Sequence, residues 1–356
     1  MKRRIFSIFC VLVLCLGLLP VTALAIYQAP SGSGTKESPY QISTADELFW
    51  FASLVNGTLE GVEQNTAACA VLTADINLSG QTWTPIGDYS AKTRNKYAGT
   101  FDGAGHTIDG LKADGGSAQG FVGYMDGGTI KNCTFNGTVT SSGSAGGICG
   151  YNYGTIENCT FNGTVTGSGN GSAGGICGSN SNSGTIKNCT SYGKVTSSKG
   201  NTGGICGYNS STVTGCTNNA AVEGYFYFGG ICGFNTGTIT NCINKGEVKL
   251  TASQGRYMGG ICGYSTNTIT NCISSGKING TCAAGICAWN STTGTVTNCY
   301  WLTSSIGGTG VYDDDGTQDK VESKTATEFA SGEVAWLLNG GTATPAEGET
   351  LAWYQN

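Results

Sequence analysis

Cysteines are the residues whose number and spacing first suggest chemistry in this chain of 356 residues, which contains 17 of them. They form two interleaved series, one at Cys133, Cys159, Cys189, Cys216, Cys242, Cys272 and Cys299, the other at Cys149, Cys177, Cys206, Cys232, Cys262 and Cys287. Each member of the second series is followed 10 or 12 residues later by a member of the first. The short CxxC or Cys/His spacings of zinc sites are absent, so the sequence predicts no metal and no cofactor.

Two interpretations of the cysteines remain open. Exported proteins can form disulfides, and neighbours stacked about 4.8 Å apart lie within the Cα separation that a disulfide spans. Alternatively, the thiols are ladders of small buried apolar side chains. Leu111 and Val122 stand at equivalent positions of the flanking sequence, and the 15 cysteines beyond residue 25 are an odd number. Both observations favour unbridged ladders.

The remaining titratable residues argue against an enzyme. His106 is the one histidine, so a zinc peptidase motif is excluded and a Ser-His-Asp triad could exist only around that residue. Asp313-Asp314-Asp315-Gly316 lacks the spacing of a calcium-binding EF-hand loop and is predicted as a solvated acidic turn. Between residues 120 and 299 the acids are Asp126, Glu157, Glu223 and Glu247. They fall at different points of the repeat, so no catalytic pair is expected there.

Threonines offer the candidate binding surface. The sequences Thr212-Val213-Thr214, Thr238-Ile239-Thr240, Thr268-Ile269-Thr270 and Thr295-Val296-Thr297 recur at one point of the repeat. Residues two apart in a strand face the same way, so we expect both threonines of each triplet to face solvent in a flat grid. Such grids resemble the ice-binding faces of β-helical antifreeze proteins. Lys131, Glu157 and Lys187 interrupt the array in the earlier turns, which favours a contact face for protein or glycan over ice.

The repeat that positions these residues is about 28 residues long. It contains three short runs with apolar or β-branched centres, separated by Gly and Asn, and it is too rich in Gly, Ser and Thr for a pair of helices. Three strands per turn, stacked on identical turns, predict an all-β, single-stranded parallel β-helix, or solenoid. In most turns Asn precedes the second cysteine, and Gly215 replaces it once. Because Asn and Gly readily adopt positive φ, we expect a corner at that position.

The ends of the chain predict export and caps. Residues 1–25 read as a secretory signal peptide cleaved after Ala25. Residues 26–62 are expected to form a tether and a capping helix that starts at Thr44, residues 63–119 irregular first coils, residues 120–302 seven regular turns, and residues 303–356 a loop and a second capping helix from Thr325 to Asn339. Loss of three basic residues with the leader leaves 18 − 3 = 15 basic against 23 acidic residues, or about −8, so we expect no nucleic-acid partner.

The repeated phrase Gly146-Gly147-Ile148-Cys149-Gly150-Tyr151-Asn152 resembles the GLUG motif of secreted and surface bacterial proteins. The flanking runs at residues 72–78, 83–87 and 101–108 fit the same family. The resemblance implies an extracellular module of the right-handed parallel β-helix type, and it implies no general activity. Longer members often continue into other modules or wall anchors; this chain ends at Asn356 without a sorting motif, which is compatible with a fragment.

These observations lead to one functional expectation and its alternatives. We expect a non-enzymatic module, secreted or on the cell surface, with an adhesive or spacer role and with glycans or host or bacterial surface proteins as partners. Membrane contact is expected only through the signal peptide. Exposed aromatics at Tyr151, Tyr153, Tyr208, Tyr225, Tyr227 and Tyr264 could stack on sugars. The alternatives are a polysaccharide lyase- or hydrolase-like β-helix, an accessory module of a larger surface peptidase, and an ice-binding threonine face.

Overall fold

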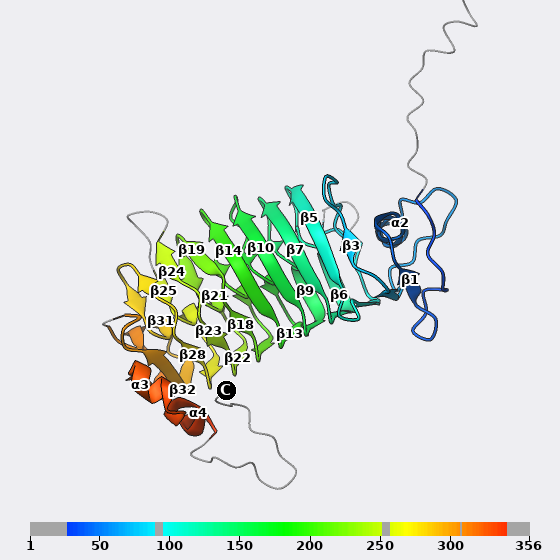
Figure 1. The fold of residues 1–356 in the computed structure, drawn as a ribbon. Coiled ribbons are helices and arrows are strands. Elements are labelled where there is room, and N and C mark those ends of the chain that lie inside the picture. Colours follow the sequence, from blue (N-terminus) through cyan, green and yellow to red (C-terminus); the bar gives the residue numbers. More distant parts are fainter. Residues whose placement is uncertain (1–26, 90–94, 251–256, 307, 340–356) are drawn as a thin grey trace, which may run out of the picture.

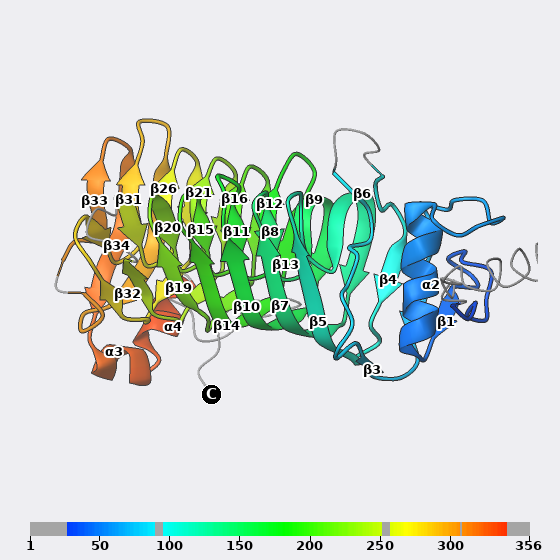
Figure 2. The ribbon, with the colours of Figure 1, turned by 90° about the horizontal axis from the view of Figure 1, so that it is seen from above.

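The protein is described by a computed structural model that covers residues 27–89, 95–250, 257–306 and 308–339. The expected signal peptide and its cleavage site therefore lie outside the described residues, as does the chain beyond Asn339. Within the described ranges the chain winds into a parallel β-helix, with successive turns hydrogen-bonded side by side (Figures 1 and 2). The predicted fold class is confirmed.

Each regular turn has four faces instead of the three that the sequence suggested. The first face carries the cysteines of the series that starts at Cys149. Its strands are β6 (Val122–Lys131), β9 (Cys149–Glu157), β12 (Cys177–Asn180), β16 (Cys206–Asn209), β21 (Cys232–Asn235), β26 (Cys262–Ser265), β31 (Cys287–Asn290) and β33 (Val311–Asp314). The strand starts from Val122 to Cys287 mark the seven regular turns expected between residues 120 and 302.

The second face carries the threonine triplets. It comprises β1 (Tyr40–Ile42), β2 (Ala70–Leu72), β4 (Thr100–Asp102), the second halves of β6 and β9, β13 (Thr185–Lys187), β17 (Thr212–Thr214), β22 (Thr238–Thr240), β27 (Thr268–Thr270), β32 (Thr295–Leu302) and β34 (Thr317–Lys324). Every neighbouring pair along this face is parallel and in register, so one core runs through all the turns.

The third face follows the corner asparagine. It comprises β3 (Ile76–Asn77), β5 (Thr107–Gly115), β7 (Thr134–Ser141), β10 (Thr160–Gly167) and β14 (Thr190–Ser197), and then the split pairs β18 (Thr217–Asn218) with β19 (Ala221–Gly224), β23 (Ile243–Asn244) with β24 (Val248–Leu250), and β28 (Ile273–Ser274) with β29 (Ile278–Asn279). The fourth face, which sequence analysis missed, is a separate sheet of β8 (Ala145–Gly146), β11 (Ala173–Gly174), β15 (Thr202–Gly203), β20 (Tyr227–Gly229), β25 (Tyr257–Gly259) and β30 (Ala283–Ala284). These strands are only two or three residues long, too short for a recognisable period-2 pattern.

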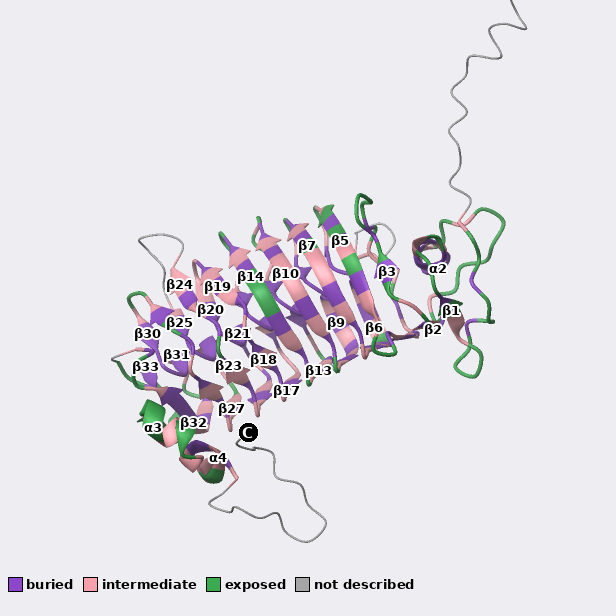
Figure 3. Ribbon diagram, in the orientation of Figure 1, coloured by how far each residue is buried: buried purple, intermediate pink, exposed green. Residues whose placement is uncertain are grey.

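The core consists of single inward columns of β-branched residues and cysteines. Ile148, Ile156 and Cys149 are fully buried, and so are their counterparts in the other regular turns. The paired glycines of the motif keep neighbouring turns close: a Cβ on Gly147 would clash with the carbonyl oxygen of Gly175, and one on Gly175 with that of Gly204. Figure 3 shows the resulting alternation of buried and partly exposed residues along the strands.

The corner prediction is confirmed. The residue before the second cysteine has positive φ throughout, with values of 48–54° at Asn132, Asn158, Asn188, Asn241, Asn271 and Asn298 and of 64° at Gly215. The asparagine side chains also bond from turn to turn, for example from Asn158 Nδ2 to Asn132 Oδ1 at 3.3 Å and from Asn298 Nδ2 to Asn271 Oδ1 at 2.7 Å. The corner asparagines are thus structural residues.

The N-terminal cap matches its prediction. Helix α2 (Ala45–Asn56) begins with a capping box formed by Thr44 and Glu47 and ends at Gly57 in the left-handed conformation. Leu48, Phe51 and Val55 are fully buried in the same core as the solenoid. The helix therefore covers the first turns (Figure 2). None of the helices in the described ranges is long and apolar enough to cross a membrane.

The C-terminal prediction is wrong in two respects. The repeat continues beyond residue 303, because β33 and β34 add another turn in which Val311 and Val321 occupy the two cysteine positions. The single helix expected from Thr325 to Asn339 is two helices, α3 (Ala326–Ala330) and α4 (Glu333–Leu338), because Gly332 takes φ 85° between them. These helices lie on the side of the solenoid, where α4 packs on Tyr300 and on the column of Ile243 and Ile273, and do not cover its open end.

Candidate functional site

The predicted threonine grid has the expected orientation. Thr212, Thr214, Thr238, Thr240, Thr268, Thr270, Thr295 and Thr297 are all partly exposed, while the residue between each pair is fully buried. The four triplets stack in register. Thr240 Oγ1 donates to Thr214 Oγ1 at 2.9 Å, and Thr297 Oγ1 donates to Thr270 Oγ1 at the same distance. These hydroxyls satisfy one another between turns, and whether the grid binds a ligand stays a prediction.

Charged residues continue the same column in the earlier turns and pair across it. Lys131 Nζ lies 3.2 Å from Asp102 Oδ2, and Lys187 Nζ lies 2.7 Å from Glu157 Oε2. The cross-turn pairs explain why both charge signs alternate at this position. The grid of neutral hydroxyls is therefore confined to the later turns.

The acids of the regular turns do not converge. Asp126 pairs with Lys96 at 2.9 Å, and Glu247 accepts a hydrogen bond from Asn279 at 2.6 Å. Glu223 lies between Lys194 and Lys249, each 2.9 Å away. Burial opposes ionisation of Glu223, but the two ammonium groups outweigh it and hold the pKa of the carboxyl below its usual value. Each of these carboxylates is thus tied to its own partner on the surface.

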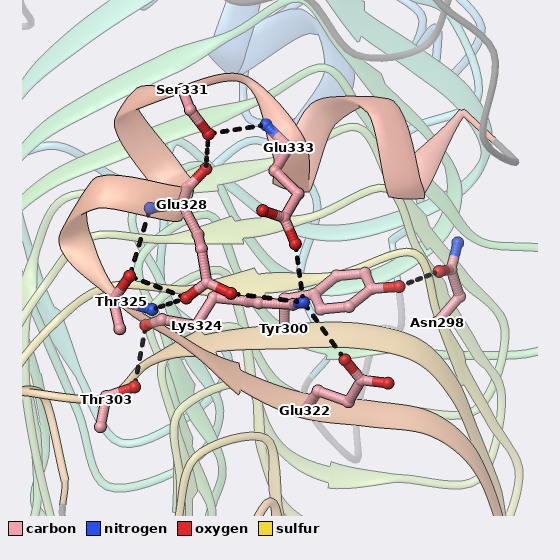
Figure 4. A network of polar contacts seen from close by, with 9 residues as sticks. All are labelled: Asn298, Tyr300, Thr303, Glu322, Lys324, Thr325, Glu328, Ser331 and Glu333. Atoms are coloured by element: carbon pink, nitrogen blue, oxygen red, sulfur yellow. Dashed lines mark hydrogen bonds and ion pairs between the residues drawn. The ribbon is translucent and has the colours of Figure 1, made fainter.

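Three glutamates gather around Lys324 where α3 and α4 meet β34 (Figure 4). Lys324 Nζ is 3.0 Å from Glu333 Oε1, 3.4 Å from Glu322 Oε2 and 3.6 Å from Glu328 Oε1, and its side chain is only 12% exposed. The backbone and hydroxyl of Thr325 and the charge of Lys324 lower the pKa of Glu328. A general acid needs a raised pKa, so the cluster is better explained as the attachment of the two helices to the solenoid.

The thiols form two continuous ladders without disulfides. All 15 cysteines of the described residues are free, and 14 are buried, Cys282 being the exception. Their Sγ atoms lie near backbone carbonyl oxygens, for example Cys149 near Tyr151 at 3.2 Å and Cys189 near Lys187 at 3.3 Å. Burial raises the pKa of Cys177 and Cys189 well above the usual value, whereas hydrogen bonds with neighbouring thiols outweigh burial and lower the pKa of Cys206 and Cys216. The ladders belong to the buried core. The described residues hold no cluster of three His, Cys, Asp or Glu side chains suited to a metal ion.

Two polar ladders inside the turns were not recognised in the sequence. Asn152, Asn180, Asn209 and Asn235 are fully buried, and each Nδ2 donates to the Oδ1 of the next at 2.7–2.8 Å. On the third face Asn218 donates to Asn244 at 2.9 Å. The sequence did carry a signal for the first of these ladders, because the ladder is formed by the last residue of the repeated Cys-Gly-x-Asn phrase.

Aromatic side chains gather on the first and fourth faces. The outward residue of Cys-Gly-x-Asn is Tyr124, Tyr151, Ser179, Tyr208, Phe234, Tyr264 and Trp289 in successive turns. We define the aromatic strip as Tyr208, Phe234, Tyr264 and Trp289 together with Tyr227 and Tyr257 of the fourth face; all six are partly exposed. Tyr89, Tyr124, Tyr151 and Tyr153 form a separate cluster on the other side of Ser179.

The tyrosines that the sequence predicted to stack on sugars thus fall into two separate clusters in the structure. Tyr208, Tyr227 and Tyr264 belong to the strip, whereas Tyr151 and Tyr153 belong to the other cluster. Phe234, Tyr257 and Trp289 were missed, although reading the variable position of the repeated phrase would have found Phe234 and Trp289. Tyr225 is partly exposed beside the strip and contributes none of its ring contacts.

The fold and these faces define a class of protein, the parallel β-solenoid with ladder-like faces. A solved structure of a “putative immunoglobulin A1 protease” from Bacteroides ovatus is similar, with a TM-score of 0.59 and 24% identity, over 87% of this chain and 91% of that one. At that identity the likeness concerns the fold. The family model of the GLUG motif matches residues 120–140, 141–166 and 254–279. The chain therefore carries GLUG motifs in three segments of its parallel β-helix.

Two curated proteins are similar over about a third of the chain. The “Putative Gly-rich membrane protein” of Evansella cellulosilytica is 32% identical over 129 residues, which are 34% of this chain and 14% of that protein. The halomucin of Haloquadratum walsbyi is 32% identical in an alignment of 172 positions that covers 36% of this chain and 2% of that protein. The matched parts are thus small fractions of these much longer relatives.

Proposed function

We propose that the chain is an exported, non-enzymatic β-helix module that is displayed at the cell surface and has an adhesive or spacer role. The observation that carries the proposal is the unbroken parallel register from β1 to β34, which makes a stiff rod with long regular faces. A rod of this kind holds whatever it carries at a fixed distance and repeats the same contact in every turn.

Three further observations support the proposal. The carboxylates of the regular turns are held by lysine or amide partners on separate positions, so none is placed to act with a second one. The leader-like residues 1–25 favour export. The name of the Evansella relative, a Gly-rich membrane protein, supports a place in the cell envelope.

Expression of the full chain from Met1 in a Gram-positive host tests this function. We expect the chain outside the cell, with Ile26 as its first residue. Retention of the purified chain on intact bacterial cells or immobilised mucin would establish the adhesive role, and passage through both would leave the spacer role. A chain that stays inside the cell with Met1 in place, or that cleaves polysaccharides, would contradict the proposal.

The threonine grid supports a flat contact face better than an ice-binding face, because Lys131, Glu157 and Lys187 continue its column with charges. Assays of thermal hysteresis and ice recrystallisation separate the two. We expect no activity in either, and activity abolished by Thr240→Lys would establish ice binding instead.

A further inference from the structure

We propose that the aromatic strip binds a neutral linear polysaccharide that lies along the solenoid axis. The inference deepens the adhesive role and rests on it. The strip spans β16, β21, β26 and β31, which lie side by side in Figure 2, and is widened by Tyr227 of β20 and Tyr257 of β25. Its rings thus repeat once per turn, about 4.8 Å apart along the axis.

The strip is continuous, and the angle between neighbouring ring planes increases towards the C-terminal end. Phe234 is nearly parallel to Tyr208, at 5.6 Å and 13°. Tyr264 is tilted by 36° from Phe234, and Trp289 by 55° from Tyr264. Tyr257 approaches Trp289 at 5.0 Å with a tilt of 36°. Trp289 stays partly exposed between these two rings, so a ligand can reach part of the indole.

The next turn supplies polar groups at this end of the strip. Asp313 is the register partner of Trp289 and is partly exposed. Tyr312 is 54% exposed, and its hydroxyl lies beside Cys282, which raises the pKa of Tyr312. A ring face next to a carboxylate and a phenol hydroxyl suits a sugar ring, which has apolar C–H groups on its faces and hydroxyl donors around its edge.

Charge and shape select the class of ligand. None of the six rings of the strip carries a charge at neutral pH, and Asp313 at its end is acidic, as is the whole chain with a formal net charge of −5. Polyanions such as acidic polysaccharides and nucleic acids are therefore disfavoured. A straight row that repeats once per turn fits a polymer with a regular repeat, and the small Ser179 ends the row on the N-terminal side.

Affinity gel electrophoresis of the chain without residues 1–25 tests the inference. The gels contain glucomannan, mixed-linkage β-glucan or arabinoxylan as neutral probes and polygalacturonate as the acidic probe. We expect retardation by at least one neutral polymer and none by polygalacturonate. Trp289→Ala should weaken the binding about tenfold, the effect of losing roughly 1.4 kcal/mol of ring contact. Trp289→Phe should retain it within about threefold.

Tyr192→Ala is the matched control, because Tyr192 is an exposed tyrosine of β14 on the third face, outside the strip. It should leave binding unchanged. If Trp289→Ala lowers the melting temperature strongly, Tyr312→Ala provides the decisive comparison. This variant should weaken binding with little effect on the fold, since the Tyr312 ring is exposed. Absence of retardation by every neutral polymer, or equal weakening by Tyr192→Ala, would overturn the inference.

The inference and the broader function can fail separately. If the Trp289→Ala variant adheres to cells or mucin as well as the parent chain does, the adhesive role is retained, but the aromatic strip is not its basis. Adhesion that survives enzymatic removal of glycans would point to a protein partner on another face. Export failure, in contrast, would contradict the surface role while leaving the gel result intact.

Discussion

At the residue scale, the inward and outward positions of the repeat differ sharply in their tolerance of charge. Ile231 is fully buried, while Thr240 is partly exposed and its hydroxyl donates to Thr214 Oγ1. Ile231→Asp would bury a carboxylate without a partner and should cost about 4 kcal/mol or more, whereas Thr240→Asp should cost about 1 kcal/mol or less. Thermal unfolding of the two variants measures the difference. Equal loss of melting temperature would show that the orientation of the strands is wrong.

The buried thiols give a second test at this scale. Since 14 of the 15 cysteines of the described residues are buried and unbridged, a thiol-reactive disulfide reagent should label native protein mainly at the half-buried Cys282. Unfolding without reductant should then expose all 15 thiols. The reaction can be followed by absorbance and by mass spectrometry of the labelled peptides. A count near one in the unfolded protein would mean that the ladders are bridged.

The structure could be predicted from the sequence at positions where the backbone conformation or burial admits few residue types. Asn and Gly215 at the corner, and Val or Leu in place of cysteine, identified positive φ and inward positions without a structure. The buried ladder from Asn152 to Asn235 could not be predicted by burial preference, because buried amides are rare; it is stable only because every amide bonds to the same amide one turn away. The aromatic strip was predictable only in part: Phe234 and Trp289 stand at the variable position of the repeated phrase, whereas Tyr257 joins the strip through the fourth face, whose strands have no recognisable pattern.

At the element scale, the capping helices differ in how far local signals determine them. The capping boxes at Thr44 and Thr325 were both found from sequence and are both present. The position of α4 was not predictable from its own residues. It depends on the outward column of the third face, where Thr134, Thr160, Thr190 and Thr217 give way to Ile243, Ile273 and Tyr300. That apolar column is what the helix covers.

The attachment of α3 and α4 should depend on pH through Lys324 and Glu328. The pKa of Lys324 is raised, chiefly by Glu333, so its stabilising contribution is present below its unfolded pKa of about 10.4 and is lost as pH rises through the folded value. The pKa of Glu328 is lowered, so its contribution is present above about 4.3 and is lost as pH falls through the folded value. Attachment should be strongest between these limits.

Hydrogen exchange of residues 326–338 measures this attachment. Protection, corrected for the intrinsic effect of pH on exchange, should fall below about pH 4 and above about pH 10.5. Lys324→Met should remove most of the alkaline dependence and only a small part of the acidic one, because Thr325 is the main cause of the lowered pKa of Glu328. Lys277→Met, at an exposed lysine of the third face, serves as the control. Protection that is the same across the pH range would contradict the role of this cluster.

At the scale of the whole molecule, stability should follow from contacts between neighbouring turns, so a complete turn can be removed and half a turn cannot. Deletion of residues 207–232 joins Cys206 to Gly233 and brings together turns with matching columns: Asn180 meets Asn235, Ile186 meets Ile239, and Ser191 meets Asn244. This chain should unfold cooperatively, with a melting temperature within a few degrees of the parent.

Deletion of residues 207–219 removes about half as many residues but shifts the following strands out of register, so that inward and outward columns no longer coincide. It should lose the cooperative transition in circular dichroism. If both deletions were equally damaging, the turns would depend on contacts beyond their neighbours, and the description of the chain as a stack of equivalent units would be wrong.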